Sequence, residues 1–128
     1  MKRSEPLSIA IVDDDESLCR SLGRLLRAAG MQSVAYPSAE AFLGDARRAT
    51  FDCLVLDVQL GGISGIKLQR QLAGSGVRTP VIFITAHDAP EVRERVLAAG
   101  CSGYFRKTDP GAEVIEAIRR AVGPISRR

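Results

Sequence analysis

Phe51-Asp52-Cys53-Leu54-Val55-Leu56-Asp57, followed by the glycine-rich run Gly61-Gly62-Ile63-Ser64-Gly65, is the stretch that decides the predicted fold. Cys53 to Leu56 form an unbroken apolar run, which is typical of a central parallel strand covered on both faces. The strand ends on Asp57, and an isolated carboxylate is strongly disfavoured inside a sheet. In an open α/β sheet the carboxyl ends of the strands face the ligand crevice, so Asp57 is a candidate reactive group. Taken alone, Asp57 is better explained as an acidic loop residue that caps the next segment.

A second apolar strand also ends in carboxylates, because Ile9-Ala10-Ile11-Val12 leads into Asp13-Asp14-Asp15-Glu16. If the two strands are neighbours, three or more negative charges crowd one edge of the sheet and must be offset by protonation or by a cation. Mg²⁺ takes hard oxygen ligands and keeps part of its water shell, which leaves room for a phosphate. Acids also favour the first turn of a helix. Asp15 and Glu16 can serve the helix while Asp13 and Asp14 face the crevice.

The composition indicates one globular domain. The chain has 128 residues, of which 45% are hydrophobic and 26% charged, and a domain of this length buries roughly two thirds of its unfolded surface. Cys19, Cys53 and Cys101 lack the spacing of metal ligands and indicate free thiols in a reducing compartment. The start does not resemble a signal peptide, and no apolar run approaches the roughly 18 residues of a membrane span. These features predict a soluble cytoplasmic domain with no membrane partner.

The positive charge of the chain raises the question of nucleic acid. The formal net charge is +3, but the basic residues are dispersed and aromatic residues make up only 5% of the chain. Because no basic stripe interleaves with aromatic residues, solvated helix faces explain the charge better than a nucleic-acid groove does. We expect no direct binding of nucleic acid by this domain.

Strand and helix patterns alternate five times along the chain. Strands are expected at residues 8–13, 32–36, 53–57, 80–85 and 103–106. Helices are expected at residues 17–29, from 38 onward, and at 64–72, 88–99 and 109–122, with Ser38, Asp88 and Asp109 as capping residues. The first helix has an inward stripe of Leu18, Leu22, Leu25, Leu26 and Ala29, and the last one of Val114, Ile115, Ile118 and Val122.

This alternation predicts an α/β fold with a five-stranded parallel sheet in the order 2-1-3-4-5. Five helices would cover both faces in a doubly wound, flavodoxin-like three-layer sandwich. The order makes the first and third strands neighbours, so Asp13, Asp14 and Asp57 would share one crevice. Thr85 and Lys107 would border it from the next two strand ends.

These side chains are the set that aspartyl phosphorylation needs, namely a carboxylate nucleophile, metal-binding acids and donors for phosphoryl oxygens. Here the chain resembles the receiver domain of two-component response regulators, and the resemblance covers nearly its whole length. The matching pieces are Ile11-Val12-Asp13-Asp14-Asp15, Leu56-Asp57 with Ser64-Gly65, Ile84-Thr85-Ala86, and Gly103-Tyr104-Phe105-Arg106-Lys107. The resemblance implies that residues 1–124 form a receiver domain. Residues 125–128 would be a tail or the start of a linker to an output domain.

The resemblance implies that Asp57 accepts a phosphoryl group from a phosphohistidine of a sensor histidine kinase. Mg²⁺ or Mn²⁺ would be held by Asp13, Asp14, Asp57 and the backbone carbonyl of Gln59, and would neutralise charge as the phosphoryl group moves. Lys107 would pair with the phosphoryl oxygens as a point charge. Beyond this self-phosphorylation and the dephosphorylation that reverses it, we expect no enzyme activity.

The resemblance also implies a switch around the phosphoryl group. The Thr85 hydroxyl and the Ala86 N–H would bind it, and Tyr104 would move into the space that Thr85 leaves. Alternatively, Tyr104 is a half-buried aromatic residue of an edge strand. Gln59 and His87 are expected to flank the phosphoryl group and set its lifetime, although an exposed loop side chain explains His87 better. The surface of the fourth helix, fifth strand and fifth helix would then control homodimerisation or an output partner.

Two positions depart from the family pattern. Receivers usually carry proline four residues after the phosphorylated aspartate, where this chain has Gly61, and glycine admits more backbone conformations. Receivers often have proline after the lysine as well, joined by a cis bond, where this chain has Lys107-Thr108. A cis bond before a residue other than proline costs roughly 3 kcal/mol, so a trans bond is expected. Such variants are similar to receivers of helix-turn-helix transcription factors, which suggests a role in transcription regulation.

Two other functions compete with this interpretation. Asp13-Asp14-Asp15-Glu16-Ser17 also fits the first motif of haloacid-dehalogenase-like phosphatases, with Asp13 as nucleophile and Asp15 as acid/base. The chain is short for that family and lacks its second acidic pair. A receiver-like binding module that works without phosphorylation is the other alternative. The clustered charges argue against it, because a degenerate site has no reason to keep them.

Overall fold

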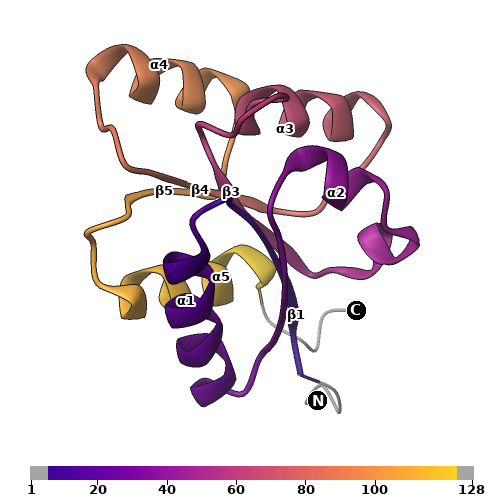
Figure 1. Cartoon of the computed structure of the whole chain (residues 1–128), viewed down its shortest axis with the longest axis vertical. Helices are drawn as coiled ribbons and strands as arrows, with labels where there is room; N and C mark the ends of the chain where they lie inside the picture. Colours follow the sequence, from indigo (N-terminus) through magenta and orange to yellow (C-terminus); the bar gives the residue numbers. More distant parts are fainter. Residues whose placement is uncertain (1–5, 124–128) are drawn as a thin grey trace.

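A parallel sheet between two layers of helices forms the molecule, as the computed structural model shows for residues 6–123 (Figure 1). In chain order the elements are β1 (Ser8–Val12), α1 (Glu16–Ala28), β2 (Gln32–Tyr36), α2 (Ala39–Leu43), the 3₁₀ helix η1 (Ala46–Thr50), β3 (Cys53–Asp57), α3 (Gly65–Gly74), β4 (Val81–Thr85), α4 (Pro90–Ala99), β5 (Gly103–Arg106) and α5 (Gly111–Val122). The strand order is β2-β1-β3-β4-β5, and every neighbouring pair is parallel. The predicted fold class and strand order are confirmed.

The sheet separates two apolar cores. In Figure 1, α1 and α5 cover one face, whereas α2, α3 and α4 cover the other. Because successive side chains of a strand point to opposite faces, Val55 of β3 packs with Leu22 and Ile118, while its neighbour Leu54 packs in the core that contains Phe42. All five residues of β3 and of β4 are buried, as their continuous apolar sequences predict.

Two of the three predicted helix caps are wrong. Ser38 caps α2 as predicted, since its hydroxyl accepts from the Ala41 N–H. The N-cap of α4 is Ala89 and that of α5 is Pro110, and neither makes a side-chain capping bond. Asp88 and Asp109 are instead engaged by side chains, including Arg93 for Asp88 and Arg106 for Asp109. For Asp88 the charged Arg93 takes the place of a helix N–H, whereas Asp109 also accepts from the backbone N–H of Arg106 (2.8 Å), which lies outside the helix.

Smaller differences concern the edges of the elements. The helix η1 was not predicted, and Leu25 of the expected inward stripe is 43% exposed. The predicted tail at 125–128 and the boundary at Pro124 lie outside the described residues. Within residues 6–123, every helix is too short or too polar to cross a membrane.

The start of α3 is fastened to the end of β3 by a glycine. Gly65 lies so close that a Cβ atom there would overlap the backbone carbonyl oxygen of Asp57. Its N–H donates to the Val58 carbonyl (3.1 Å), and the Ser64 hydroxyl caps the helix by accepting from the Lys67 N–H (3.1 Å). The helix and the strand end therefore hold each other's position directly behind Asp57.

We expect Gly65→Ala to destabilise the fold by roughly 1–3 kcal/mol, because the new methyl group meets backbone that cannot turn away. Gly74→Ala, at the other end of α3, is the matched control. A Cβ there meets nothing within 4 Å, and alanine favours the helix by about 1 kcal/mol over glycine. Urea denaturation of both variants measures the difference, and equal stability would contradict the close approach at Gly65.

Candidate functional site

Three carboxylates meet at the carboxyl edge of the sheet. Val12 of β1 pairs with Leu56 of β3, so the residues that follow in each strand, Asp13 and Asp57, lie side by side. Asp13 is 2% exposed and Asp57 is 4% exposed, whereas Asp14 is exposed. One carboxylate oxygen from each of the three lies within 4.8 Å of the other two. The structure thus brings together the three acids that the sequence placed at strand ends.

Lys107 supplies the positive charge of the cluster from the end of β5. Its Nζ lies 3.0 Å from Asp13 Oδ2, 3.2 Å from Asp57 Oδ2 and 3.8 Å from Asp15 Oδ2. Burial alone would lower the pKa of Lys107, but the hydrogen bond to Asp13 and the charge of Asp57 outweigh it and raise the pKa above its usual value. No cis peptide bond occurs among residues 6–123, so the Lys107-Thr108 bond is trans, as predicted.

Asp13 is the carboxyl group that burial disturbs most. Burial raises its pKa from 3.8 to about 6, and the nearby charge of Asp57 adds to the rise. The hydrogen bonds from the Asp15 N–H (3.0 Å) and from Lys107 Nζ (3.1 Å) act in the opposite direction. The Cys19 thiol, which donates to the Asp13 carbonyl, has a pKa raised to about 11, chiefly by burial, and adds no charge. One ammonium among several acids leaves the cluster short of positive charge.

This cluster fits a divalent cation. Asp13 Oδ2 is buried and accepts no hydrogen bond, although it is ion-paired with Lys107. An anionic oxygen without a donor is a ready ligand for a hard cation such as Mg²⁺. Asp13, Asp14 and Asp57 could hold the ion. Gln59 lies in the loop directly behind them, where its N–H donates to Asp57 Oδ1 (3.1 Å).

Thr85 closes the site from β4, but its hydroxyl is occupied elsewhere. The side chain is fully buried, and its Oγ1 donates to the His87 carbonyl (3.1 Å) and accepts from the His87 N–H (3.0 Å). Ala86 and His87 are exposed beyond the strand end, and Gln59 is exposed on the opposite loop. Of these three, the Gln59 backbone is bonded to the cluster through Asp57, and the His87 backbone holds the Thr85 hydroxyl.

Tyr104 is held at the surface of α4. Its hydroxyl donates to Asp88 Oδ1 (2.9 Å), and the Arg93 guanidinium lies 2.6 Å from Asp88 Oδ2 and 5.5 Å from the centre of the Tyr104 ring. The hydrogen bonds from Arg93 and then from Tyr104 lower the pKa of Asp88. Burial and then the bond to Asp88 raise the pKa of Tyr104. The predicted inward movement of Tyr104 therefore requires that it leave Asp88.

Sequence reasoning missed two contacts of this site. One is the role of Asp88 as the partner of Tyr104, and the other is Glu40 of α2, whose Oε2 accepts from the Ile63 N–H (3.2 Å) in the loop behind Asp57. The partners are separated by 16 and 23 residues. No local pattern marks such pairs, because only the packing of α2 and α4 on the sheet brings them together.

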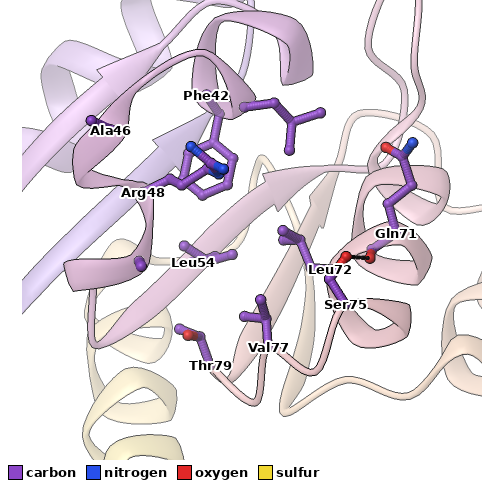
Figure 2. A pocket seen from close by; sticks show the side chains of 11 residues that line it. Phe42, Ala46, Arg48, Leu54, Gln71, Leu72, Ser75, Val77 and Thr79 are labelled. Atoms are coloured by element: carbon purple, nitrogen blue, oxygen red, sulfur yellow. Dashed lines mark hydrogen bonds between the residues drawn. The ribbon is translucent and has the colours of Figure 1, made fainter.

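A separate cavity of about 390 Å³ lies near the amino ends of β3 and β4, away from the acidic cluster (Figure 2). It is bordered by α2, η1, the end of α3 and the loop that precedes β4, and its floor includes Phe42, Leu54 and Leu72. Arg48 and the polar side chains of Gln71, Ser75 and Thr79 also line it, but no carboxylate does. This cavity is therefore no part of the acidic cluster.

Fold and site together define a class of protein: a doubly wound α/β domain with clustered carboxylates and one lysine at the carboxyl edge of its sheet. The family model described as the response regulator receiver domain matches residues 9–119. The chain belongs to this family, the receiver domains of two-component systems.

Named relatives support the assignment. The chain is similar to the response regulator protein TodT of Pseudomonas putida, with 36% identity over 114 residues that cover 89% of this chain and 50% of TodT. It is 33% identical to the transcriptional regulatory protein FixJ of Rhizobium meliloti over 114 residues, which cover 89% of this chain and 56% of FixJ. The chain thus spans about half the length of the curated relatives it matches.

Solved structures agree with this assignment. The crystal structure of FixJ-N superimposes with a TM-score of 0.81 at 31% identity and covers 95% of both chains. The response regulator StyR gives a TM-score of 0.81 at 35% identity, covering 93% of this chain and 60% of that one.

The raised pKa of Asp13 predicts how stability depends on pH. Between its usual value of 3.8 and about 6, the folded chain binds more protons at Asp13 than the unfolded chain, so the free energy of unfolding falls as the pH rises through this window. Above the window the cost of the buried charge is fully present. We therefore expect Asp13→Asn to raise the free energy of unfolding by roughly 1–3 kcal/mol at pH 8 and by much less at pH 4.

Urea denaturation at both pH values, without divalent cations, measures this effect. Asp14→Asn is the matched control, because Asp14 is the exposed neighbour. A gain at pH 8 that is equal for the two variants would contradict the burial argument.

Proposed function

We propose that this domain is a phosphoacceptor switch, in which Asp57 takes a phosphoryl group from a phosphohistidine of a sensor histidine kinase in a Mg²⁺-dependent reaction. The observation that carries the proposal is the shared cluster of Asp57, Asp13 and Asp14, with oxygens within 4.8 Å, and Lys107 Nζ 3.2 Å from Asp57. A phosphate is an anion that a bare group of acids would repel. A cation and an ammonium beside the nucleophile make its approach favourable.

Each residue has a task in this reaction. An Asp57 carboxylate oxygen attacks phosphorus, the bond from phosphorus to the histidine nitrogen breaks, and the nitrogen keeps the electron pair. Asp13, Asp14, Asp57 and the Gln59 carbonyl would hold Mg²⁺ or Mn²⁺, which would supply positive charge to the transferred oxygens. Lys107 Nζ already donates to Asp57 Oδ2 (3.2 Å), and in this proposal it would donate to a phosphoryl oxygen instead.

The same group would operate the switch. A phosphoryl oxygen gives Thr85 a charged acceptor in place of the His87 carbonyl, and hydrogen bonds to charged groups are stronger than neutral ones. In this proposal the Ala86 N–H would bind the same group, and Gln59 and His87 would flank it and set its lifetime. As Thr85 moves, Tyr104 exchanges Asp88 for the vacated space. The change reaches the α4-β5-α5 surface, where we propose homodimerisation or binding of an output partner.

The context proposed for this switch is transcription regulation. FixJ, a relative, is named a transcriptional regulatory protein, and the chain matches about half of its length. In this proposal residues 1–124 are the receiver, and residues 125–128 are a tail or lead to an output domain. A phosphatase that uses Asp13 as nucleophile and Asp15 as acid/base is less compatible with the site, because Asp15 Oδ1 accepts from the Leu18 N–H (3.1 Å) as the cap of α1.

Incubation with acetyl phosphate and Mg²⁺ tests the proposal. We expect intact-mass spectrometry to show one added phosphoryl group on the wild type and none on Asp57→Asn. Asp52→Asn is the matched control, because Asp52 directly precedes the other end of β3, and we expect it to be modified like the wild type. Beryllofluoride with Mg²⁺ should shift the oligomeric state in the same variants that accept the phosphoryl group.

Several outcomes would contradict the proposal. A wild-type protein that remains unmodified with the donor and Mg²⁺ present excludes it. Modification of Asp57→Asn to the wild-type extent would move the acceptor to another residue. Steady turnover of a phosphomonoester that is lost in Asp13→Asn but kept in Asp57→Asn would favour the phosphatase instead.

A further inference from the structure

The loop between β3 and α3 contains two adjacent glycines in a place where the backbone must hold its shape. Gly61 and Gly62 are both exposed, and they lie two and three residues beyond Gln59, whose carbonyl is a proposed metal ligand. Each glycine adds conformational freedom that has to be removed for the loop to keep one geometry. A contact that restrains this segment therefore bears on the metal site as well as on the loop.

Glu40 makes such a contact from α2. Its Oε2 accepts from the Ile63 N–H (3.2 Å), and a Cβ atom on Gly62 would lie 2.8 Å from the same oxygen. Gly62 has a φ of +82°, a left-handed conformation that glycine adopts without strain. The absent side chain at 62 is thus what lets the carboxylate reach the backbone of 63. Helix and loop fit each other at this point.

We propose that Glu40 is a positioning residue for the acceptor site. Its bond to the Ile63 N–H, which we call the Glu40 clasp, restrains the loop and so holds the Gln59 carbonyl where a cation needs it. The inference rests on the function proposed above. A carboxylate that accepts from a backbone N–H restrains the loop without rigid residues in the loop itself. Glu40 touches neither the phosphoryl group nor the cation, and it acts through the backbone of residues 59–63.

The Glu40 clasp restrains the backbone of a loop whose own sequence, with two adjacent glycines, does not restrain it. Gly61 is not among the glycines with positive φ, a Cβ there meets nothing within 4 Å, and no hydrogen bond from its N–H is found in the described chain. These observations do not oppose proline at this position, which fixes φ near −65° and has no N–H. Gly61→Pro should restore order to a loop that has lost Glu40, because it restricts the same backbone by another route.

Two substitutions at Glu40 separate the hydrogen bond from the charge. Glu40→Gln keeps an oxygen that can accept from Ile63, whereas Glu40→Ala removes it. Glu40 is exposed, and alanine is a strong helix former, so both variants are expected to fold. Glu113→Ala is the matched control, since Glu113 occupies the first turn of α5 as Glu40 does that of α2.

Mn²⁺ titration followed by electron paramagnetic resonance, with amide hydrogen exchange at Ile63, tests the inference on the unphosphorylated chain. We expect Glu40→Ala to weaken Mn²⁺ binding by about threefold to tenfold, the equivalent of one net hydrogen bond, and to speed exchange at Ile63. Glu40→Gln and Glu113→Ala should remain within about twofold of the wild type, well inside that effect. Glu40→Ala with Gly61→Pro should regain most of the lost affinity.

The outcomes distinguish this inference from the proposal beneath it. If the wild type binds Mn²⁺ and is phosphorylated, but Glu40→Ala binds equally well, the clasp has no positioning role. Equal losses in Glu40→Gln and Glu40→Ala, without rescue by Gly61→Pro, would mean that the charge of Glu40 acts and the hydrogen bond does not. A wild type that neither binds Mn²⁺ nor accepts a phosphoryl group overturns the proposed function, and the inference falls with it.

Discussion

The crowding of carboxylates around one ammonium is the interaction on which the site depends. Asp13 and Asp57 are almost fully buried next to each other, and Lys107 is ion-paired with both. A buried charge is costly unless it is paired, and here one cation serves several anions. The imbalance is visible in the raised pKa of Asp13, which burial causes and Asp57 increases. A site in this state can accommodate a further positive charge.

The scaffold keeps this unfavourable arrangement in place through packing. The acids follow strands whose side chains are buried in both cores, so the strand ends cannot separate without opening the sheet. Gly65 packs α3 against the Asp57 carbonyl and bonds to the Val58 carbonyl, and Glu40 bonds the loop in between to α2. The electrostatic strain of the cluster is thus offset by apolar burial elsewhere, as is common where function requires a locally unfavourable geometry.

The contacts of Thr85 and Tyr104 connect this cluster with the outer surface. Thr85 bonds to the backbone of His87, and Tyr104 bonds to Asp88, the next residue in the same loop. One short loop therefore carries the partners of both residues, and the proposed switch would act through this loop. Coupling of this kind needs two discrete arrangements with different contacts, and the described structure supplies the contacts of one of them.

Much of the fold followed from local sequence. The apolar run Cys53 to Leu56 and the alternation of strands and helices were sufficient for the parallel order, because crossover rules leave few topologies. The same order placed Asp13, Asp14 and Asp57 at one edge, since the ends of neighbouring parallel strands coincide. Family resemblance then named the receiver domain, which the family comparison confirmed. The trans peptide bond between Lys107 and Thr108 was also predictable, because no proline follows Lys107 to favour the cis form.

Tertiary structure alone decided which polar side chains are partners. Asp88 and Asp109 are of a residue type that caps helices well. In the structure Asp88 is bonded to Tyr104 and Arg93 instead, and Asp109 is bonded to Arg106. The bond from Ile63 to Glu40 and the close approach of Gly65 to Asp57 likewise exist only because α2 and α3 pack on the same face of the sheet. Sequence pattern reports the periodicity of an element and so the face it buries. It carries no measure of the distance between side chains on different elements, and hydrogen bonds and ion pairs depend on that distance.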